Sequence, residues 1–408
     1  MNHQHATTQM PISFSRLALI NAALLMLVLT LPLRAADLDA FWEQPRKGAN
    51  SFNGEPPDET YFRALADTGA TWVRLTFSKW PSAKRDFLIG DADKYTGLVP
   101  EDLATLRRTL DAAHVAGLKV VVTPLSLPGA RWQQQNNDRF DDRLWSQPEY
   151  ADQAVRFWRD LAAALADHPA VAAYNLINEP VPEKKGGVGE DTGVAERSAW
   201  QLANAGTPRD LHAFYSRVIA AIRQVDAVTP VMVDGGWYAN PKSLAAWPTK
   251  LADDRVLYAF HMYEPYEATS VPNMKRAKPL RYPGVETGHG ATRQVWDRDA
   301  VAAHIGTAFD WAKAQGLPPT RVVAGEFGCM RLWADCATYL DDVITAVDAR
   351  GGHWAFYSFR EDVWDGMDYE LPPSLKTGQF YWLTETGKAD TLPRDGALMK
   401  LLRERMKD

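Results

Sequence analysis

Cysteine is scarce in this chain: among 408 residues there are two, Cys329 and Cys336, both within the stretch GCMRLWADC. Two cysteines without a histidine nearby offer too few ligands for a structural zinc ion, which argues against a metal site of this kind. The short spacing leaves two interpretations open. The pair forms one disulfide, as is typical of an oxidising compartment, or it remains two buried thiols.

Low-complexity segments are also missing, and so is an excess of positive charge. The formal net charge is −6, and it becomes −8 without residues 1–36, because that segment contains two arginines and no acidic residue. An acidic chain of this kind gives no support to the binding of nucleic acid. A hydrophobic content of 46% is enough for a large buried core.

The amino-terminal segment has the order of a secretory signal. An arginine precedes the apolar run LALINAALLMLVLTLPL at 17–33, and small residues follow it in RAAD. The run is short for a membrane span and is interrupted by an asparagine and a proline, which favours cleavage near Ala36 over an uncleaved anchor. We therefore expect 1–36 to be a cleaved signal peptide. The mature protein is expected to be secreted or periplasmic, with no stable membrane insertion.

Short β-branched or aromatic runs alternate with amphipathic helical segments along the rest of the chain. The strand candidates are 47–53, 71–77, 119–125, 171–178, 230–236, 256–263, 321–328 and 353–359. The helical candidates are 100–117, 148–169, 209–227, 298–316, 337–352 and one helix after residue 393. Eight strands alternating with helices over about 360 residues predict an α/β fold, a (β/α)₈ TIM barrel, as a single domain over 37–408.

The connections of this predicted barrel are unequal. Helices return to strands through short turns such as AGLK and QGLPPT, whereas strands lead into long segments at roughly 125–147, 181–208, 264–297 and 360–392. Active sites of this fold lie at the carboxyl ends of the strands, where those long loops meet. An open doubly wound sheet is disfavoured, because no GxGxxG turn follows the first strand in GANSFNGEPPDE.

Two predicted strands end in a glutamate, Glu179 in AAYNLINEP and Glu326 in VVAGEFG. Two carboxylates on either side of one bond are the minimum equipment for glycoside hydrolysis. Arg74 ends the second strand and is a candidate to hold one carboxylate ionised. His261 and Tyr263 end the sixth strand and can donate hydrogen bonds to a carboxylate, although a buried histidine and a rim tyrosine are also common structural features.

These motifs resemble glycoside hydrolase family 5, the cellulases, mannanases and related β-glycanases of the retaining Asn-Glu-Pro barrels. The motifs VRLTF, NLINEP, HMYEP and GEFG stand in the expected order, and the resemblance covers about 40–405. It implies that Glu179 is the acid/base and Glu326 the nucleophile. It also implies a retaining mechanism, with the two carboxyl groups about 5 to 5.5 Å apart. No cofactor and no metal are expected.

The same resemblance implies supporting roles near the reacting bond. Asn178 would hydrogen-bond the 2-hydroxyl of the substrate, Arg74 and Tyr263 would orient Glu326, and His261 would line the first subsite.

Two positions depart from the family pattern. Leu125 or Ser126 stands where the family usually has a histidine after the third strand. Tyr357 falls nearest the position of a usual tryptophan, with Trp354 three residues earlier. Both departures leave the substrate open.

Several aromatic and charged residues fall on the long-loop side. Sugar stacking is one interpretation of the loop tryptophans, and packing within the loops is the other. These candidates are Trp132, Trp237, Trp333 and Trp364. The tryptophans at 72, 158 and 311 lie within elements and are expected to pack.

The basic residues Lys275, Arg276, Lys278 and Arg281 form either a solvated loop or a rim that attracts an acidic polysaccharide. The acidic residues Glu361, Asp362, Asp365, Asp368 and Glu370 either order their loop or bind a cation, although they lack the spacing of a calcium loop.

The sequence therefore predicts a monomeric retaining glycoside hydrolase that acts on a β-linked polysaccharide, in the first place an endo-β-1,4-glucanase. Alternatives within hydrolases are a β-mannanase, a β-1,3-glucanase and a hydrolase of an exopolysaccharide containing uronic acid. A catalytically inactive polysaccharide-binding barrel is the alternative outside enzymes, and the presence of both glutamates argues against it. No separate carbohydrate-binding module is visible, since one helix follows residue 393.

Overall fold

Eight parallel strands close into a barrel in the order β1-β10-β9-β6-β5-β4-β3-β2. They are β1 (Lys47–Ser51), β2 (Trp72–Thr76), β3 (Lys119–Thr123), β4 (Val171–Asn175), β5 (Val231–Asp234), β6 (Val256–Met262), β9 (Val322–Phe327) and β10 (His353–Phe356). The computed structural model describes residues 34, 36–288, 293–385, 387 and 394–407. Each strand lies within a run predicted from the sequence, which confirms the (β/α)₈ architecture.

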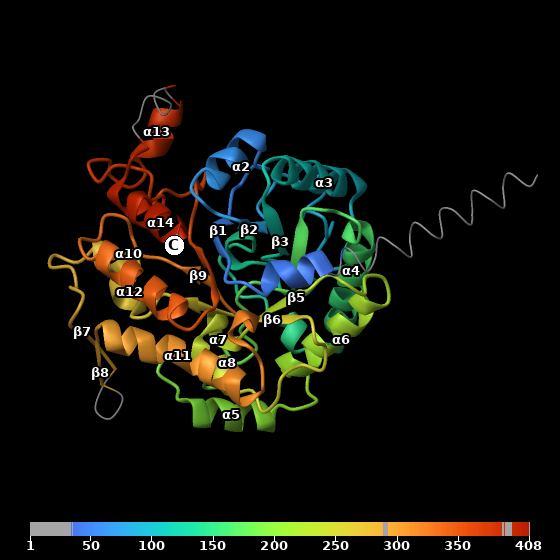
Figure 1. Cartoon of the computed structure of the whole chain (residues 1–408). Coiled ribbons are helices and arrows are strands. Elements are labelled where there is room, and N and C mark those ends of the chain that lie inside the picture. Colours follow the sequence, from blue (N-terminus) through green and yellow to red (C-terminus); the bar gives the residue numbers. More distant parts are fainter. Residues whose placement is uncertain (1–33, 35, 289–292, 386, 388–393, 408) are drawn as a thin grey trace, which may run out of the picture.

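Helices surround the strands on the outside of the barrel (Figure 1). They are α2 (Glu59–Ala66), α3 (Pro100–Val115), α4 (Pro148–Leu165), α6 (Leu211–Arg223), α11 (Arg298–Ala314), α12 (Cys336–Asp348) and α14 (Ala397–Lys407). In α4, a proline occupies the first turn, and Ala154, Phe157, Trp158 and Leu161 are buried at helical spacing. Trp158 also donates from Nε1 to the carbonyl oxygen of Leu176, 2.9 Å away, and so joins the helix to the barrel.

The long segments that follow the strands carry further elements. They are η1 (Gln133–Gln135), η2 (Arg143–Trp145), α5 (Val194–Ala203), α7 (Gly236–Ala239), α8 (Pro241–Ala245), α9 (Tyr266–Thr269), α10 (Val271–Met274), β7 (Val285–Thr287), β8 (Gln294–Trp296), η4 (Pro319–Arg321) and α13 (Gln379–Glu385). The antiparallel pair β7 and β8 lies beside α11 at the edge of the molecule (Figure 1). The sequence prediction treated 264–297 as a loop and missed this hairpin, because its strands have three residues each.

Apolar side chains close the barrel at the starts of the strands. Residues 36–42 are helical, and Leu38 and Trp42 are buried in one cluster with Trp72. Trp42 donates from Nε1 to the carbonyl oxygen of Ala172 at 3.0 Å, and its ring packs edge-on against His353. The predicted signal peptide, 1–36, lies outside the described residues except for Arg34 and Ala36. Cleavage near Ala36 would leave this closing segment in the mature chain.

Cys329 and Cys336 are joined in a disulfide between β9 and the start of α12. The sequence left open whether these cysteines form a disulfide or remain two buried thiols, and in the structure they form a disulfide. Among the described residues, no helix combines the length and the apolar character that a membrane crossing requires.

Candidate active site

A cleft of about 730 Å³ opens at the carboxyl ends of the strands. This is the end of the barrel where the long connections meet, as the sequence predicted. The cleft is lined by nine of the predicted site residues: Trp132, Asn178, Glu179, Trp237, His261, Tyr263, Glu326, Tyr357 and Trp364. Arg74 is fully buried and contacts the cleft residues Asn178 and Glu326.

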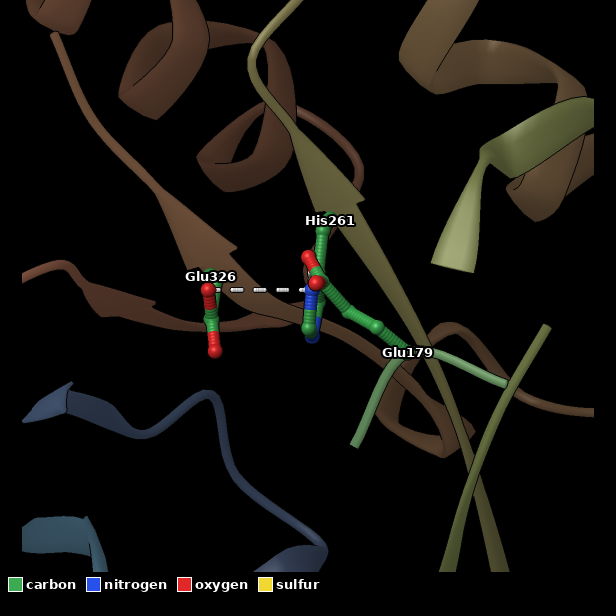
Figure 2. Close-up of side chains that lie close together, drawn as sticks. All are labelled: Glu179, His261 and Glu326. Atoms are coloured by element: carbon green, nitrogen blue, oxygen red, sulfur yellow. Dashed lines mark hydrogen bonds and ion pairs between the residues drawn. The ribbon is translucent and has the colours of Figure 1, made fainter. Parts of the chain in front are cut away.

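Two local features of the backbone bring the glutamates together. Glu326 lies within β9 and pairs in register with His261 of β6. Glu179 has a φ of 49°, a left-handed conformation that turns the chain at the mouth, four residues after the end of β4. One oxygen of each glutamate and one ring nitrogen of His261 lie within 4.8 Å of one another. Figure 2 shows the three side chains converging.

Glu326 is held by two donors. Its Oε1 accepts from Arg74 Nη1 at 2.6 Å, and its Oε2 accepts from the Tyr263 hydroxyl at 2.9 Å. Burial raises the pKa of Glu326, and the nearby His261 and Arg74 oppose that rise. The ion pair with Arg74 therefore favours the ionised carboxylate, with both oxygens fixed in direction.

Glu179 has a different environment. Its Oε1 is hydrogen-bonded to Nδ1 of His261 at 2.9 Å, and 17% of its side chain is exposed to the cleft. Burial raises the pKa of Glu179 to about 8, Arg74 opposes this rise, and the negative charge of Asp234 adds to it. Burial also lowers the pKa of His261, which keeps the imidazole neutral. At neutral pH Glu179 therefore holds a proton while Glu326 faces a guanidinium.

Arg74 is the centre of a buried polar network. Its Nε donates to Asn175 Oδ1 at 2.8 Å, and its Nη2 donates to Asn178 Oδ1 at 2.7 Å and to Asp234 Oδ2 at 3.3 Å. Its Nη1 is also 3.2 Å from Asn50 Oδ1. A buried guanidinium is stable only when its donors are matched in this way.

Sequence reasoning missed Asp234 and Asn175. Asp234 accepts from the backbone N–H of Glu179 at 3.1 Å and from Asn175 Nδ2 at 2.9 Å, so it fixes the start of the acid's loop. A signal was present. Strand residues two apart share a face, so Asn175 and Asp234, at the ends of β4 and β5, could have been assigned to the barrel interior with Arg74.

Asn178 has a donor that no residue of the described chain uses. Its Oδ1 is fixed by Arg74, and its Nδ2 is buried without a hydrogen-bond partner among those residues. Because buried polar atoms in proteins are normally paired, an amide fixed at one end and lining the cleft is ready to donate to a ligand.

Glu179, His261 and Glu326 could together offer three ligand atoms to a metal ion. The chemistry of these donors fits a metal poorly. Both oxygens of Glu326 already accept, one from the cationic Arg74 and one from Tyr263. A divalent cation at this point would have to compete with a buried guanidinium for the same carboxylate.

One end of the cleft, beyond β10 and β1, contains Tyr357 and Trp364, whose rings are 6.2 Å apart. The Tyr357 hydroxyl donates to Glu361 Oε2 at 2.6 Å, and Lys79 pairs with the other oxygen of Glu361 at 2.8 Å. Leu125, one of the two residues considered for the family's usual histidine position after β3, also lines the cleft. The ion pair between Lys79 and Glu361, together with the hydrogen bond from Tyr357, therefore fixes the side chains at this end of the cleft.

The other end of the cleft, beyond β3, β4 and β5, contains Trp132, Trp237 and Tyr238. Trp237, Tyr238 and the next residue all have positive φ, at 46°, 57° and 60°, which is unusual for residues other than glycine. Glu183 is buried beneath this turn and accepts from the backbone N–H of Trp237. A side chain at Gly236 would come within 2.3 Å of the Glu183 carboxyl, so a larger residue there would displace this buried glutamate.

The remaining candidates divide between packing and the loops. Trp333 is 3% exposed and donates from Nε1 to the carbonyl oxygen of Leu280, so it packs instead of lining the cleft. The tryptophans at 72, 158 and 311 are buried, as expected. None of the four basic residues at 275–281 lines the cleft, and Arg281 pairs with Asp335 at 2.7 Å.

The acidic run at 361–370 orders its own loop. Glu370 accepts from Arg360, and both oxygens of Asp365 accept from the backbone N–H of Gly378 at 2.9 Å. Asp362 accepts from the backbone of residues 54 and 55. Of the two interpretations that the sequence left open, these contacts favour loop ordering over a cation site.

A closed (β/α)₈ barrel with two glutamates facing each other at the ends of β4 and β9 defines the class of glycoside hydrolases. The sequence pattern of the family "Cellulase (glycosyl hydrolase family 5)" matches residues 38–362. The chain belongs to this family, as the motifs of the sequence indicated.

Named relatives differ in activity. The chain is 25% identical to "Beta-xylosidase" of Phanerodontia chrysosporium over 66% of its own length and 46% of that protein. It is 25% identical to "Endoglucanase C" of Acetivibrio thermocellus over 56% of its length and 59% of that protein. The chain thus spans about half the length of the curated relatives it matches. The solved structure of endoglucanase Cel5A from Thermotoga maritima shares the fold, with a TM-score of 0.58 at 16% identity over 88% of this chain and 96% of that one.

Proposed function

We propose that this protein is a retaining, endo-acting β-glycanase whose main substrate is β-1,4-glucan. The observation that carries the proposal is the pairing of Glu179 and Glu326, whose nearest oxygens lie within 4.8 Å. Carboxyl groups about 5 to 5.5 Å apart are typical of retaining glycosidases, whereas inverting enzymes need a wider gap for water. The different environments of the two glutamates support a different role for each.

In the first step, the Glu326 carboxylate attacks the anomeric carbon as the glycosidic C–O bond breaks. Glu179, whose pKa is raised to about 8 by burial, gives its proton to the leaving oxygen. The products are a glycosyl ester on Glu326 and a free sugar hydroxyl. Arg74 and Tyr263 hold Glu326 in the direction of attack, and Asn178 offers its free Nδ2 to a hydroxyl of the bound sugar.

In the second step, Glu179 is a carboxylate and takes a proton from water. The water oxygen attacks the anomeric carbon, the ester bond to Glu326 breaks, and both glutamates return to their starting protonation states. The two inversions give net retention. His261, neutral because burial lowers its pKa, stays bonded to Glu179 through both steps and adds no charge to the site.

The shape of the cleft supports endo action. Aromatic residues line the cleft around the glutamate pair, namely Tyr357 and Trp364 after β10, Trp132 after β3 and Trp237 after β5. Sugar rings can stack on such residues on either side of the cleaved bond, which suits binding within a chain. A β-1,4-glucan is favoured because one named relative is an endoglucanase.

The direct test is trapping with a 2-deoxy-2-fluoro β-cellobioside followed by peptide mass mapping. We expect a covalent label on the peptide that contains Glu326, with slow recovery of activity as the ester hydrolyses. A label on another residue, or turnover without any ester, would overturn the assignment of the nucleophile. Lack of both binding and hydrolysis would favour a barrel with another role.

A substrate panel separates the alternatives. Release of reducing ends is compared for carboxymethyl-cellulose, β-mannan, a β-1,3-glucan and an exopolysaccharide containing uronic acid. We expect the highest kcat/KM on the β-1,4-glucan, with a fast fall in viscosity that marks endo cleavage. Faster cleavage of any other polymer would replace the glucan as the main substrate.

Export and monomeric assembly belong to the same proposal. Its support is the signal-like order of residues 1–36 and the position of the 36–42 segment, which closes the barrel and would remain after cleavage near Ala36. Amino-terminal sequencing of the protein from the cell envelope and the medium tests the site of cleavage. Light scattering tests the oligomeric state.

A further inference from the structure

A second cavity, of about 350 Å³, lies next to the active-site cleft. Glu190, in the connection after β4, and Glu264, directly after β6, line both spaces. The cleft and this cavity, which we call the side pocket, therefore share a wall. A group attached to a chain in the cleft could enter the side pocket at this wall.

The side pocket is built by parts of the chain that are far apart in sequence. The β7–β8 hairpin forms one wall, where Trp296 is 4% exposed and donates from Nε1 to Thr287 Oγ1 at 2.7 Å. Helix α11 contributes His304, and α8 contributes Lys242. A barrel needs no such hairpin, so this wall is an addition beside the cleft.

His304 presents an unused polar atom to the side pocket. The residue is 6% exposed, and its Nε2 has no hydrogen-bond partner among the described residues, since the nearest oxygen of Glu264 is 3.8 Å away. Burial lowers the pKa of His304 to about 3, so the ring is neutral at ordinary pH. A buried nitrogen that is left in this way is a position for a ligand hydroxyl.

Lys242 adds a donor to the pocket lining. Its positive charge acts to lower the pKa of Glu264, Glu190 and His304, which line the same pocket. Burial raises the pKa of Glu264 to about 7, so its carboxyl can carry a proton or accept one near neutral pH. The pocket lining thus contains both donors and acceptors, and Trp296 contributes an apolar surface.

The combination of donors and acceptors in the side pocket disfavours an ion as its ligand. Across the described chain, the one group of three or more acids, histidines or cysteines that converges closely enough for a metal is the cleft trio of Glu179, His261 and Glu326. The acids of the side pocket therefore do not form a cation site. An anion would meet three acids, Glu190, Asp191 and Glu264, beside the two cations Lys242 and Arg293, and Arg293 is already paired with Glu286. A neutral ligand with several hydroxyl groups matches both the donors and the acceptors.

We propose that the side pocket binds a neutral sugar unit carried as a branch on the β-glycan that occupies the cleft. This inference rests on the proposed β-glycanase function and names the class of its preferred substrate. The volume of about 350 Å³ is at the lower end of the usual range for ligand cavities, about 300 to 1,000 Å³, which suits one ring and not a second main chain.

The test compares linear and branched substrates of equal backbone length. The probes are cello-oligosaccharides with and without α-1,6-xylosyl branches, and manno-oligosaccharides with and without α-1,6-galactosyl branches. Each is measured for kcat/KM with the parent protein and for affinity by calorimetry with a Glu326→Gln variant. The ratio of branched to linear substrate is the readout, because it cancels effects on the cleft that both substrates share.

We expect the parent to prefer one branched series over its linear counterpart by about fivefold or more. The reason is that the branch sugar would add one or two hydrogen bonds with the side pocket. Lys242→Met and Gln294→Ala, at two residues that line the side pocket, should each lower that ratio by about threefold to fivefold. Lys313→Met is the matched control, because this lysine is exposed at the end of α11, away from the pocket. The control should leave the ratio unchanged.

The outcomes separate the two proposals. If the linear chains are cut and bound but neither branched series is preferred, the side-pocket inference is wrong and the β-glycanase proposal stands. The same conclusion follows if the preference exists but survives both pocket variants. If the parent neither cuts nor binds any of the linear or branched chains, both proposals are wrong.

Discussion

The two ends of the barrel interior are built from the same strands but carry opposite chemistry. On β2, Trp72 faces the closed end and Arg74, two residues on, faces the cleft. On β5, Met232 is followed in the same way by Asp234. Because alternate strand residues share a face, the interior face of both strands changes from apolar to polar between one interior position and the next. The closed end is a hydrophobic core, and the open end is a network of buried charges.

This difference separates stability from function. At the closed end, Trp42 is held by one hydrogen bond and by aromatic packing that includes the ring of His353, contacts that stabilise the fold without an ion pair. At the open end, Arg74 is shared between two carboxylates, Asp234 and Glu326. Buried ion pairs add little to stability, because desolvation offsets the attraction. The charges at the cleft are therefore best explained by chemistry, and substitutions at the two ends should have different signatures.

The largest effect is expected at Glu326. Replacing it with glutamine keeps the shape and removes the nucleophile, so kcat on an aryl β-cellobioside should fall by about 10⁴-fold or more. The protein should still fold but with a lower midpoint of thermal unfolding, since the neutral amide leaves the buried charge of Arg74 with Asp234 as its remaining carboxylate partner. Steady-state kinetics and calorimetry measure the two quantities. Activity equal to that of the parent would show that Glu326 is not the nucleophile.

The next effect concerns Glu179 and pH. Its pKa is raised to about 8, so the proton it donates is present below that pH and is lost above it. We expect kcat/KM of the parent to fall tenfold per pH unit above about 8. Glu179→Gln should lower kcat by about 10² to 10⁴-fold on natural glycans. With an aryl leaving group that needs no proton, the variant should lose less in the first step and show no basic limb.

A matched pair of tryptophans contrasts the two ends directly. Trp42→Ala at the closed end should destabilise the protein by about 3 to 5 kcal/mol through loss of packing, with kcat unchanged in the fraction that stays folded. Trp132→Ala in the cleft should raise KM up to about tenfold, by loss of a stacking surface, with little change in unfolding. Urea denaturation and kinetics on both variants are sufficient. Equal effects on KM would contradict the proposed separation.

The smallest effect is expected at Glu183, beneath the turn that carries Trp237. Burial raises the pKa of Glu183 to about 7, so its carboxylate form, the stronger acceptor for the Trp237 N–H, predominates above that pH. KM of the parent should therefore fall about twofold to threefold between pH 6 and pH 8. Glu183→Gln should abolish this change and alter kcat by less than twofold. A pH-dependent KM that persists in the variant would remove Glu183 from this role.

The sequence predicted the site best where a polar side chain could be assigned to the end of a predicted strand. Glu179 and Glu326 follow runs that can only be buried strands, and in a parallel barrel all such ends face one mouth. The eight strands and the family followed from that order. The strands were predicted too long at their ends, as at 171–178, because Leu176 and Ile177 continue the apolar, buried pattern after strand pairing has stopped at Asn175.

Other parts of the site depend on contacts between distant segments. Asp234 was passed over because a single acid in PVMVDGG has no partner in the sequence, whereas in the fold it meets Arg74 and the backbone of Glu179. Trp333 falls in a loop after β9 like the cleft tryptophans, and only the packing around Leu280 shows that it points elsewhere. The side pocket needs a hairpin with strands too short to be recognised by periodicity.

The closure of the barrel has a consequence for how the chain reaches this fold. The last seam joins β1 to β10, where the backbone N–H of Arg46 donates to Nδ1 of His353 across 307 positions of sequence. Contacts at such separations are slow to form, because the intervening chain must be ordered first. A chain growing from its amino terminus therefore keeps one side of β1 as an unpaired strand edge, open to association with other chains, until β10 has been made. The yield of folded protein accordingly depends on its last strand as much as on its catalytic ones.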